Sequence, residues 1–152
     1  MRERLDPLIQ QHRNQPGGLM PLLHAVQDTF GYVPTETVEP IAKGLNLSRA
    51  EVHGVISYYH HFRQTPPGRT VVQVCRAESC KACGSDALMA EVEQRLGLKS
   101  HETRADGLVS LEPVYCLGLC AQSPAMQVND RLFGRVTSER LPAVLLAVEV
   151  AA

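Results

Sequence analysis

Five cysteines, in two groups far apart in the chain, constrain the fold more than any other feature of the sequence. Three lie in the stretch CRAESCKACG (residues 75–84), and two more follow as Cys116 and Cys120. The outer framework is Cys75-x4-Cys80, an interval of 35 residues, and then Cys116-x3-Cys120. For these thiols to act together, the fold must bring the two groups to one place.

The cysteines lie in a region whose pattern alternates between strands and helices. Apolar, β-branched runs predict strands at residues 70–74, 108–115, 125–128 and 131–136. Helical spacing predicts a helix over residues 85–96 and a last one capped by Thr137 or Ser138. Pro113 is expected at a sheet edge or strand end, because proline has no N–H. The order β-α-β, hairpin, α favours an α+β fold with a mixed four-stranded sheet of the thioredoxin-like kind.

The first sixty or so residues predict a small bundle of short helices instead. Apolar residues recur at helical spacing within residues 5–9, 19–30 and 37–43, with Gly31 and Gly44 as expected helix stops. The sequence from Ser48 to Glu51 has the form of a capping box and opens a fourth helix. The stretch QTPPG (residues 64–68) cannot continue a helix. It predicts a boundary between a helical domain, residues 1–66, and a second domain, residues 67–152.

Each outer cysteine pair directly follows a predicted strand. If strands 70–74 and 108–115 are neighbours, both loops leave the sheet at the same end and their sulfurs converge. Thiolate is the soft ligand that selects zinc, cuprous copper or iron–sulfur clusters. Gaps of four and three residues let one loop deliver the two sulfurs that each iron of a binuclear cluster needs. We therefore predict a [2Fe–2S] site with four ligands and one spare thiol, Cys83; the ligands are Cys75, Cys80, Cys116 and Cys120.

Three alternatives stay open at this point. A structural zinc site is one, although only Cys80-x2-Cys83 has the usual zinc-knuckle spacing. The same pair, between a strand and a helix, is also where a thioredoxin-like fold places a dithiol redox site. A plant-type ferredoxin spacing is the third, in which Cys83 is a ligand and either Cys116 or Cys120 is spare.

The residues around the predicted ligands are small or charged. Ala77, Ser79 and Gly118 would let backbone amides approach the sulfurs of an anionic cluster. Arg76 follows Cys75 directly. Its charge can stabilise the reduced cluster, or its side chain can be a solvated loop residue, and the sequence leaves both readings open.

Composition excludes some partners and favours a compartment. A net charge of -1 and a pI of about 6.6 provide no footprint for nucleic acid. The most apolar run, residues 141–152, is too short to cross a bilayer and carries Glu149, so no membrane insertion is expected. The N-terminus has no secretory apolar region. Clustered cysteines in odd number then favour a cytoplasmic metal or redox protein.

Four stretches resemble one known family, the 24-kDa-type [2Fe–2S] subunits of NADH-linked complexes. They are FGYVP (residues 30–34), SYYHHF (57–62), VQVCRAESC (72–80) and VYCLGLCAQSPAMQVN (114–129). The resemblance implies a helical N-terminal part followed by a thioredoxin-like ferredoxin domain. We expect the helical part to dock on another subunit, because so small a bundle gains by burying exposed apolar surface at an interface. The family's ligand pattern maps onto the same four cysteines chosen above, and it does not require Cys83.

Within that family, CRAESC (residues 75–80) and LEPVYCLG (111–118) are most similar to the gamma subunit of the NAD-dependent, molybdenum-containing formate dehydrogenase. Complex I and bidirectional NiFe hydrogenase subunits are the close alternatives. The resemblance implies a flavoprotein partner with FMN and the NAD site, and a larger subunit with the molybdenum cofactor and further clusters. The chain itself has neither GxGxxG nor a Walker A loop, so we expect one-electron transfer and no substrate site of its own.

Overall fold

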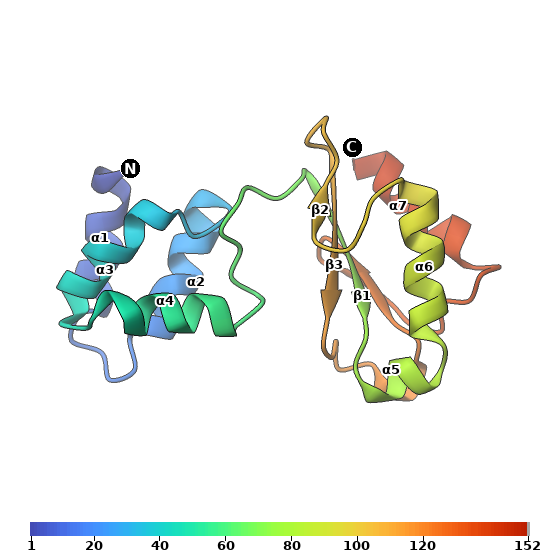
Figure 1. Ribbon diagram of the computed structural model, residues 1–152, viewed down its shortest axis with the longest axis horizontal. Coiled ribbons are helices and arrows are strands. Elements are labelled where there is room, and N and C mark those ends of the chain that lie inside the picture. The colour runs from blue at the N-terminus through green and yellow to red at the C-terminus, as the bar shows by residue number, and fades with distance from the viewer. Residues whose placement is uncertain (152) are drawn as a thin grey trace. The chain divides into compact units, whose positions relative to one another are not determined.

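The chain separates into two compact units, Met1–Pro66 and Pro67–Ala152, in a computed structural model that describes residues 1–151 (Figure 1). Residue 152, the predicted end of the second domain, lies outside the described residues. So do the side chains of residues 147 and 149–151, and with them that of Glu149. Residues 1–66 form the helical unit, and residues 67–151 the sheet unit.

The helical unit consists of four α-helices whose apolar faces meet in one core, which confirms the predicted bundle. The helices are α1 (Arg2–His12), α2 (Leu19–Phe30), α3 (Val38–Leu45) and α4 (Arg49–Tyr58), with a 3-10 turn, η1 (Thr35–Thr37), before α3. Gly31 ends α2 with a left-handed φ of 84°, as predicted, because a residue without Cβ adopts this conformation at little cost.

Two other helix signals had different outcomes. The capping box is confirmed: the Glu51 N–H donates to Ser48 Oγ (3.1 Å), and the Ser48 N–H donates to Glu51 Oε2 (2.8 Å). Gly44, however, lies inside α3, which stops at Asn46 with φ 55°. A Cβ at Gly44 would overlap Cγ2 of Ile9 in α1. Close packing of α1 on α3, rather than helix termination, therefore explains this glycine.

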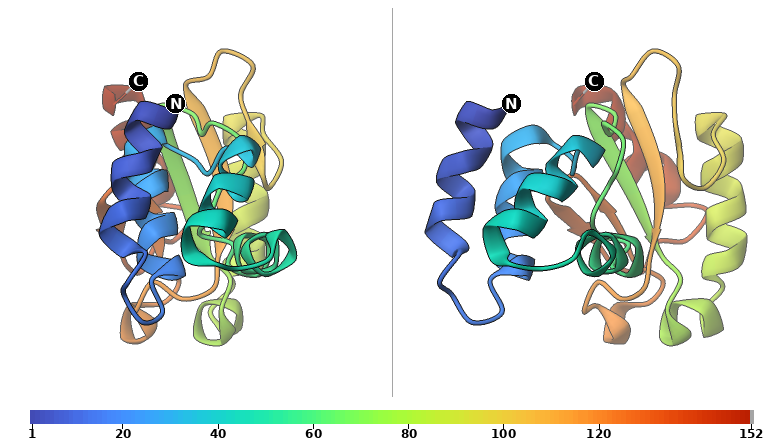
Figure 2. Two further views of the ribbon diagram at one scale, coloured as in Figure 1. Left: turned by 90° about the vertical axis from the view of Figure 1, so that its left-hand side faces the viewer. Right: turned by 60° about the vertical axis from the view of Figure 1, so that its left-hand side comes forward.

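The sheet unit is a mixed sheet with two long helices on one face (Figures 1 and 2). Its strands are β1 (Thr70–Cys75), β2 (Glu102–Thr103), β3 (Val109–Val114), β4 (Met126–Val128) and β5 (Arg131–Phe133), in the order β2-β3-β1-β4-β5. β1 and β3 are parallel, and all other neighbours are antiparallel. Val72 and Val74 of β1 pack against Leu88 of α6 (Ser85–Leu96) and Val144 of α7 (Leu141–Ala151). The predicted α+β class is confirmed.

The details of this unit differ from expectation in four places. The sheet has five strands instead of four, because β2 contains only two exposed polar residues and leaves no alternating pattern. A short helix, α5 (Glu78–Ala82), was not predicted either. β5 ends at Phe133, earlier than expected. The last helix begins at Leu141 and not directly after Thr137 or Ser138. A turn precedes it, in which the Leu141 N–H donates to the Thr137 carbonyl. Within residues 1–151, no helix is long and apolar enough to cross a membrane.

Pro113 shows how the sheet accommodates a proline next to its central strand. Val109 and Leu111 of β3 turn their carbonyl groups toward β2, where they accept from Arg104 and His101. Pro113 faces the same side, but β2 pairs only with residues 110 and 111 of β3. Its missing N–H therefore points to a side where no strand pairs, and Pro113 lies at a local edge of the sheet, one residue before β3 ends.

Candidate metal centre

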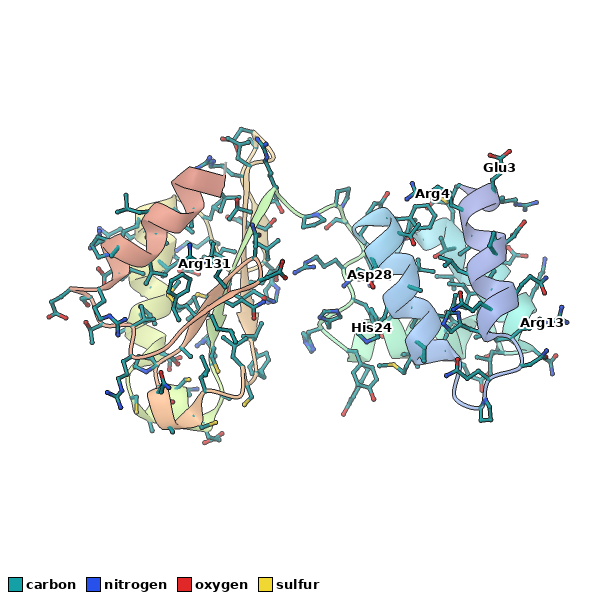
Figure 3. The ribbon with its side chains drawn as sticks, turned by 180° about the vertical axis from the view of Figure 1, so that it is seen from behind. Glu3, Arg4, Arg13, His24, Asp28 and Arg131 are labelled. Atoms are coloured by element: carbon teal, nitrogen blue, oxygen red, sulfur yellow. The ribbon has the colours of Figure 1, made fainter. Side chains whose placement is uncertain are left out.

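The two outer cysteine pairs emerge from neighbouring parallel strands. The register pairs Cys75, the last residue of β1, with Val114, the last residue of β3. The segments that follow β1 and β3 therefore leave the sheet at the same end. Sulfur atoms gather there, beside the short helix of this unit (Figure 3). Residues 75–80 are the first cysteine loop, and residues 116–120 the second.

In the first cysteine loop both thiols are buried. Cys75 is 2% exposed and Cys80 3%. The Cys75 N–H donates to the carbonyl of Ala125 (3.0 Å), a fully buried residue that packs on both cysteines. Cys80 lies in α5, where the Lys81 N–H donates to the carbonyl of Ala77 (2.8 Å). Backbone structure thus holds both sulfurs in place.

In the second cysteine loop both thiols are exposed, and the backbone takes unusual conformations. Cys116 has φ 109° and Gly118 φ 75°. The Gly118 N–H donates to Cys116 Sγ at 3.3 Å. A backbone amide therefore approaches a sulfur, as expected from the small residue at this position. Cys120 opens a 3-10 turn, η2 (Cys120–Gln122), and its Sγ lies 3.8 Å from that of Cys116.

The distance between these two sulfurs fits a shared metal ion. Two thiolates on one tetrahedral metal, with bonds of about 2.3 Å, lie about 3.8 Å apart. The Cys116 sulfur raises the pKa of the Cys120 thiol, and desolvation and the charges of Cys80 and Cys75 raise it further. The Cys120 thiol is therefore close enough to the other three cysteines for their charges to act on it. No three His, Cys, Asp or Glu side chains among the described residues are arranged around one metal ion.

Two pairs of thiols fit a binuclear iron–sulfur cluster, because each iron takes two protein sulfurs. The first loop supplies Cys75 and Cys80 from a buried position, and the second supplies Cys116 and Cys120 from the surface. The structure brings these four residues together, and their assignment as ligands stays a prediction.

Cys83 lies outside both loops, at the C-terminal end of α5. Its thiol is exposed, and its N–H donates to the carbonyls of Ser79 and Cys80 (both 3.1 Å). Cys80, its partner in the dithiol alternative, is buried instead. The structure therefore places the two thiols of this motif in different environments.

Two serine hydroxyls connect the loops; the sequence marked Ser79 only as a small residue and did not identify Ser123. Ser79, in the first loop, donates to the Cys120 carbonyl at 3.0 Å. Ser123 lies 2.9 Å from Ser79 Oγ and 3.4 Å from Cys80 Sγ. No sequence signal marks Ser123, because its partner in the first loop is 43 residues away.

Arg76, within the first loop, is held in an ion pair. Its Nη2 lies 2.7 Å from Asp86 Oδ1 near the start of α6, and the Lys81 ammonium approaches the other carboxylate oxygen at 3.8 Å. Hydrogen bonding to Arg76 holds the pKa of Asp86 below its usual value. Arg76 is therefore a partly paired cation, and not simply a solvated loop residue.

Solved structures share this architecture. The chain superposes on an NAD+-reducing [NiFe]-hydrogenase in the H2-reduced state with a TM-score of 0.69 and 23% identity. The match covers 88% of this chain and 22% of that chain. At this identity the likeness shows the fold alone.

Curated relatives cover most of the chain. It is 35% identical over 145 residues to an E-type subunit of NADH-quinone oxidoreductase from Rhizobium meliloti, covering 95% of this chain and 86% of the relative. It is 39% identical over 128 residues to NADH-quinone oxidoreductase subunit 2 of Thermus thermophilus, covering 84% and 71%. It is 29% identical over 137 residues to the NADP-reducing hydrogenase subunit HndA of Solidesulfovibrio fructosivorans, covering 90% and 80%.

A family model matches nearly the whole chain. The matched residues, 5–149, cover most of both units and include all five cysteines. The model describes thioredoxin-like [2Fe–2S] ferredoxins. The two pairs of thiols at the end of a mixed sheet fit the one [2Fe–2S] cluster of such a protein, and the chain belongs to the thioredoxin-like [2Fe–2S] ferredoxin family.

Proposed function

We propose that this chain is an electron-transfer subunit, which exchanges single electrons between its [2Fe–2S] cluster and the FMN of a partner NADH-binding flavoprotein. The observation that carries the proposal is the convergence of two thiol pairs at one end of the β1–β3 pair. The cluster supplies one-electron chemistry when bound. The chain's own residues hold it: Cys75, Cys80, Cys116 and Cys120 are the proposed ligands.

The two cysteine loops divide the work of holding and exposing the cluster. The buried first loop shields one side from water, and the exposed second loop leaves the other side open to a partner. An electron can then pass without any bond to substrate being made in this chain, which accords with the lack of a nucleotide motif. We place the complex in the cytoplasm, where a reducing environment keeps five free thiols reduced.

The helical unit is proposed to dock on another subunit. Tyr58 at the end of α4 is 75% exposed, and Tyr59 is 44% exposed. Both line an apolar hollow within this unit, together with Leu19, Leu47 and Val55. Exposed aromatic side chains around an apolar hollow are typical of protein interfaces.

The finer proposal concerns the complex itself. We propose an NAD-dependent formate dehydrogenase with a molybdenum-cofactor subunit, supported by the similarity of residues 75–80 and 111–118 to its gamma subunit. The relatives named above make an NADH-quinone oxidoreductase or an NAD-linked hydrogenase the alternatives.

The cluster is tested first, on the isolated chain. After anaerobic purification and reconstitution, we expect two irons and two acid-labile sulfides per chain. We also expect an EPR signal on reduction with dithionite, and reduction by NADH only when the flavoprotein is added. A colourless protein that binds zinc, or that forms only a Cys80–Cys83 disulfide, would contradict electron transfer.

The complex is tested separately, by recovering it through an affinity tag on this chain. We expect formate-dependent NAD+ reduction and bound molybdenum. Hydrogen-dependent NAD+ reduction with nickel, or NADH–quinone activity, would overturn the formate dehydrogenase proposal and leave the electron-transfer proposal standing.

A further inference from the structure

We propose that the Ser123 hydroxyl, held in place by Ser79, is a positioning group that donates a hydrogen bond to the Cys80 sulfur and stabilises the reduced cluster. This inference rests on the proposed function, because it requires Cys80 to be a cluster ligand. It adds two residues outside the cysteine pattern that set how readily the cluster accepts an electron.

Four contacts join the two hydroxyls to the cysteine loops. Ser123 Oγ lies 3.4 Å from Cys80 Sγ, 2.9 Å from Ser79 Oγ and 3.0 Å from the Cys120 carbonyl oxygen. Ser79 Oγ lies 3.0 Å from the same carbonyl oxygen. The network therefore bridges a sulfur of the first loop and the backbone of the second.

Counting hydroxyl protons shows why both serines are needed. Each hydroxyl has one proton and a ligating thiolate has none, so Ser123 must be the donor in its contact with the Cys80 sulfur. The Cys120 carbonyl competes for that proton. Ser79 donates to the same carbonyl and occupies one of its two acceptor positions, which weakens the competition for the Ser123 proton.

Burial makes this one hydrogen bond important. Cys80 is 3% exposed, so its sulfur has little access to water, and a hydrogen bond in such surroundings is stronger than in solvent. The exposed Cys116 sulfur instead has the Gly118 amide and solvent beside it. Hydrogen bonds to the sulfurs help to set the potential of an iron–sulfur cluster. Reduction adds negative charge to the cluster, so a hydrogen bond donated to one of its sulfurs favours the reduced form.

Three variants and a matched control test the inference. Ser123→Ala removes the donor, Ser79→Ala frees the Cys120 carbonyl to compete for it, and Ser123→Thr keeps the hydroxyl. Ser57→Ala is the control, because this hydroxyl donates only to the Gly54 carbonyl in α4 (3.1 Å). The measurements are iron and sulfide content, the midpoint potential from an EPR-monitored titration, and exchangeable-proton couplings in the reduced protein by pulsed ENDOR.

We expect the midpoint potential to fall in Ser123→Ala and to fall by less in Ser79→Ala. It should stay at the wild-type value in Ser123→Thr and Ser57→Ala. One exchangeable-proton coupling should be missing from Ser123→Ala alone. A full cluster in Ser123→Ala with the wild-type potential and all couplings would overturn the inference.

Two other outcomes are also decisive. If Ser123→Ala assembles no cluster, the Ser79→Ala variant decides. A lowered midpoint potential in Ser79→Ala, together with a wild-type potential in Ser123→Thr, supports the inference. A wild-type potential in Ser79→Ala overturns it. If the wild type itself binds no iron or sulfide after reconstitution, the proposed function fails, and the inference with it. A loaded wild type with no effect of Ser123→Ala rejects the inference alone.

Discussion

The two cysteine loops present their thiols in opposite ways. In the first loop, Cys75 and Cys80 are buried, and strand end, short helix and the packed Ala125 hold them. In the second loop, Cys116 and Cys120 are exposed, and two left-handed backbone conformations shape the turn between them. With the proposed ligand set, the difference means that one fold would supply a buried half-site and a solvent-exposed half-site to the same cluster.

The largest expected effect comes from removing one thiol from each loop. Cys75→Ala and Cys120→Ala should each abolish cluster assembly, because three thiolates leave one iron short of a ligand. Cys83→Ala is the control and should keep the full cluster with an unchanged EPR spectrum. Iron and sulfide analysis after anaerobic reconstitution measures all three. Loss of the cluster in Cys83→Ala with retention in Cys116→Ala or Cys120→Ala would establish the plant-type arrangement.

The next largest effect is expected on removal of the cluster, which should change hydrogen exchange in the two loops to different extents. In the first loop and the residues just after it, the amides of Cys75, Lys81 and Cys83 donate to backbone carbonyls, whereas in the second loop the Gly118 amide donates to a sulfur. On chelation of iron we expect hydrogen exchange over residues 117–120 to accelerate by more than about tenfold, and residues 75–83 to change much less. Equal acceleration in both loops would show that the first is not held by the fold.

Substituting one of two glycines with left-handed backbone conformations, Gly118 or Gly84, should have a smaller effect and tests the second loop alone. Gly118 (φ 75°) lies between the second loop's thiols, and Gly84 (φ 91°) lies just before α6. A Cβ would meet no atom within 4 Å at either position, so alanine costs only the left-handed strain, about 1–2 kcal/mol. Denaturation of the apo protein should show this loss in both variants.

Only Gly118→Ala should also release iron faster to a chelator, because only its strain acts on the two exposed thiols. Gly84→Ala is the matched control. If both variants release iron at the wild-type rate, the turn conformation at position 118 does not contribute to cluster binding.

The smallest expected effect concerns charge beside the first loop. Asp86→Asn leaves Arg76 and Lys81 without their carboxylate partner, and the added positive charge favours the reduced, more negative cluster. The midpoint potential should therefore rise. The rise should be small, corresponding to a change of less than about tenfold in the equilibrium constant for reduction, because exposed ion pairs are screened by solvent. Glu91→Gln, which removes an ion pair to Arg95 on the same helix, should leave the potential unchanged. A lowered potential in Asp86→Asn would contradict this account.

Much of this structure could be predicted from local pattern. The capping box at Ser48, the stop at Gly31 and the hairpin between the strands predicted at residues 125–128 and 131–136 were found because each rests on residues a few positions apart. The misses were of another kind. β2 is too short to show a period, and Gly44 serves the packing of α3 on Ile9, a contact between distant residues that no local rule records.

The candidate site divides in the same way. Cysteine spacing identified four thiols as two pairs, since a loop of three or four residues is itself a local unit. It could not predict that one pair is buried and the other exposed, nor that Ser123 lies beside Cys80. Those facts depend on how the chain after β3 folds back onto α5.

By itself, the sequence determined the order of the longer elements without β2 and α5, the break near Pro66, and the two thiol pairs that mark this chain as an iron–sulfur protein. These are properties of short stretches, in which neighbouring residues decide the backbone conformation. Only the tertiary structure decided that β1 and β3 lie side by side, which brings both pairs to one end of the sheet. It also decided which sulfur is dry and which hydroxyl reaches it, because burial and long-range contacts depend on the packing of the whole unit.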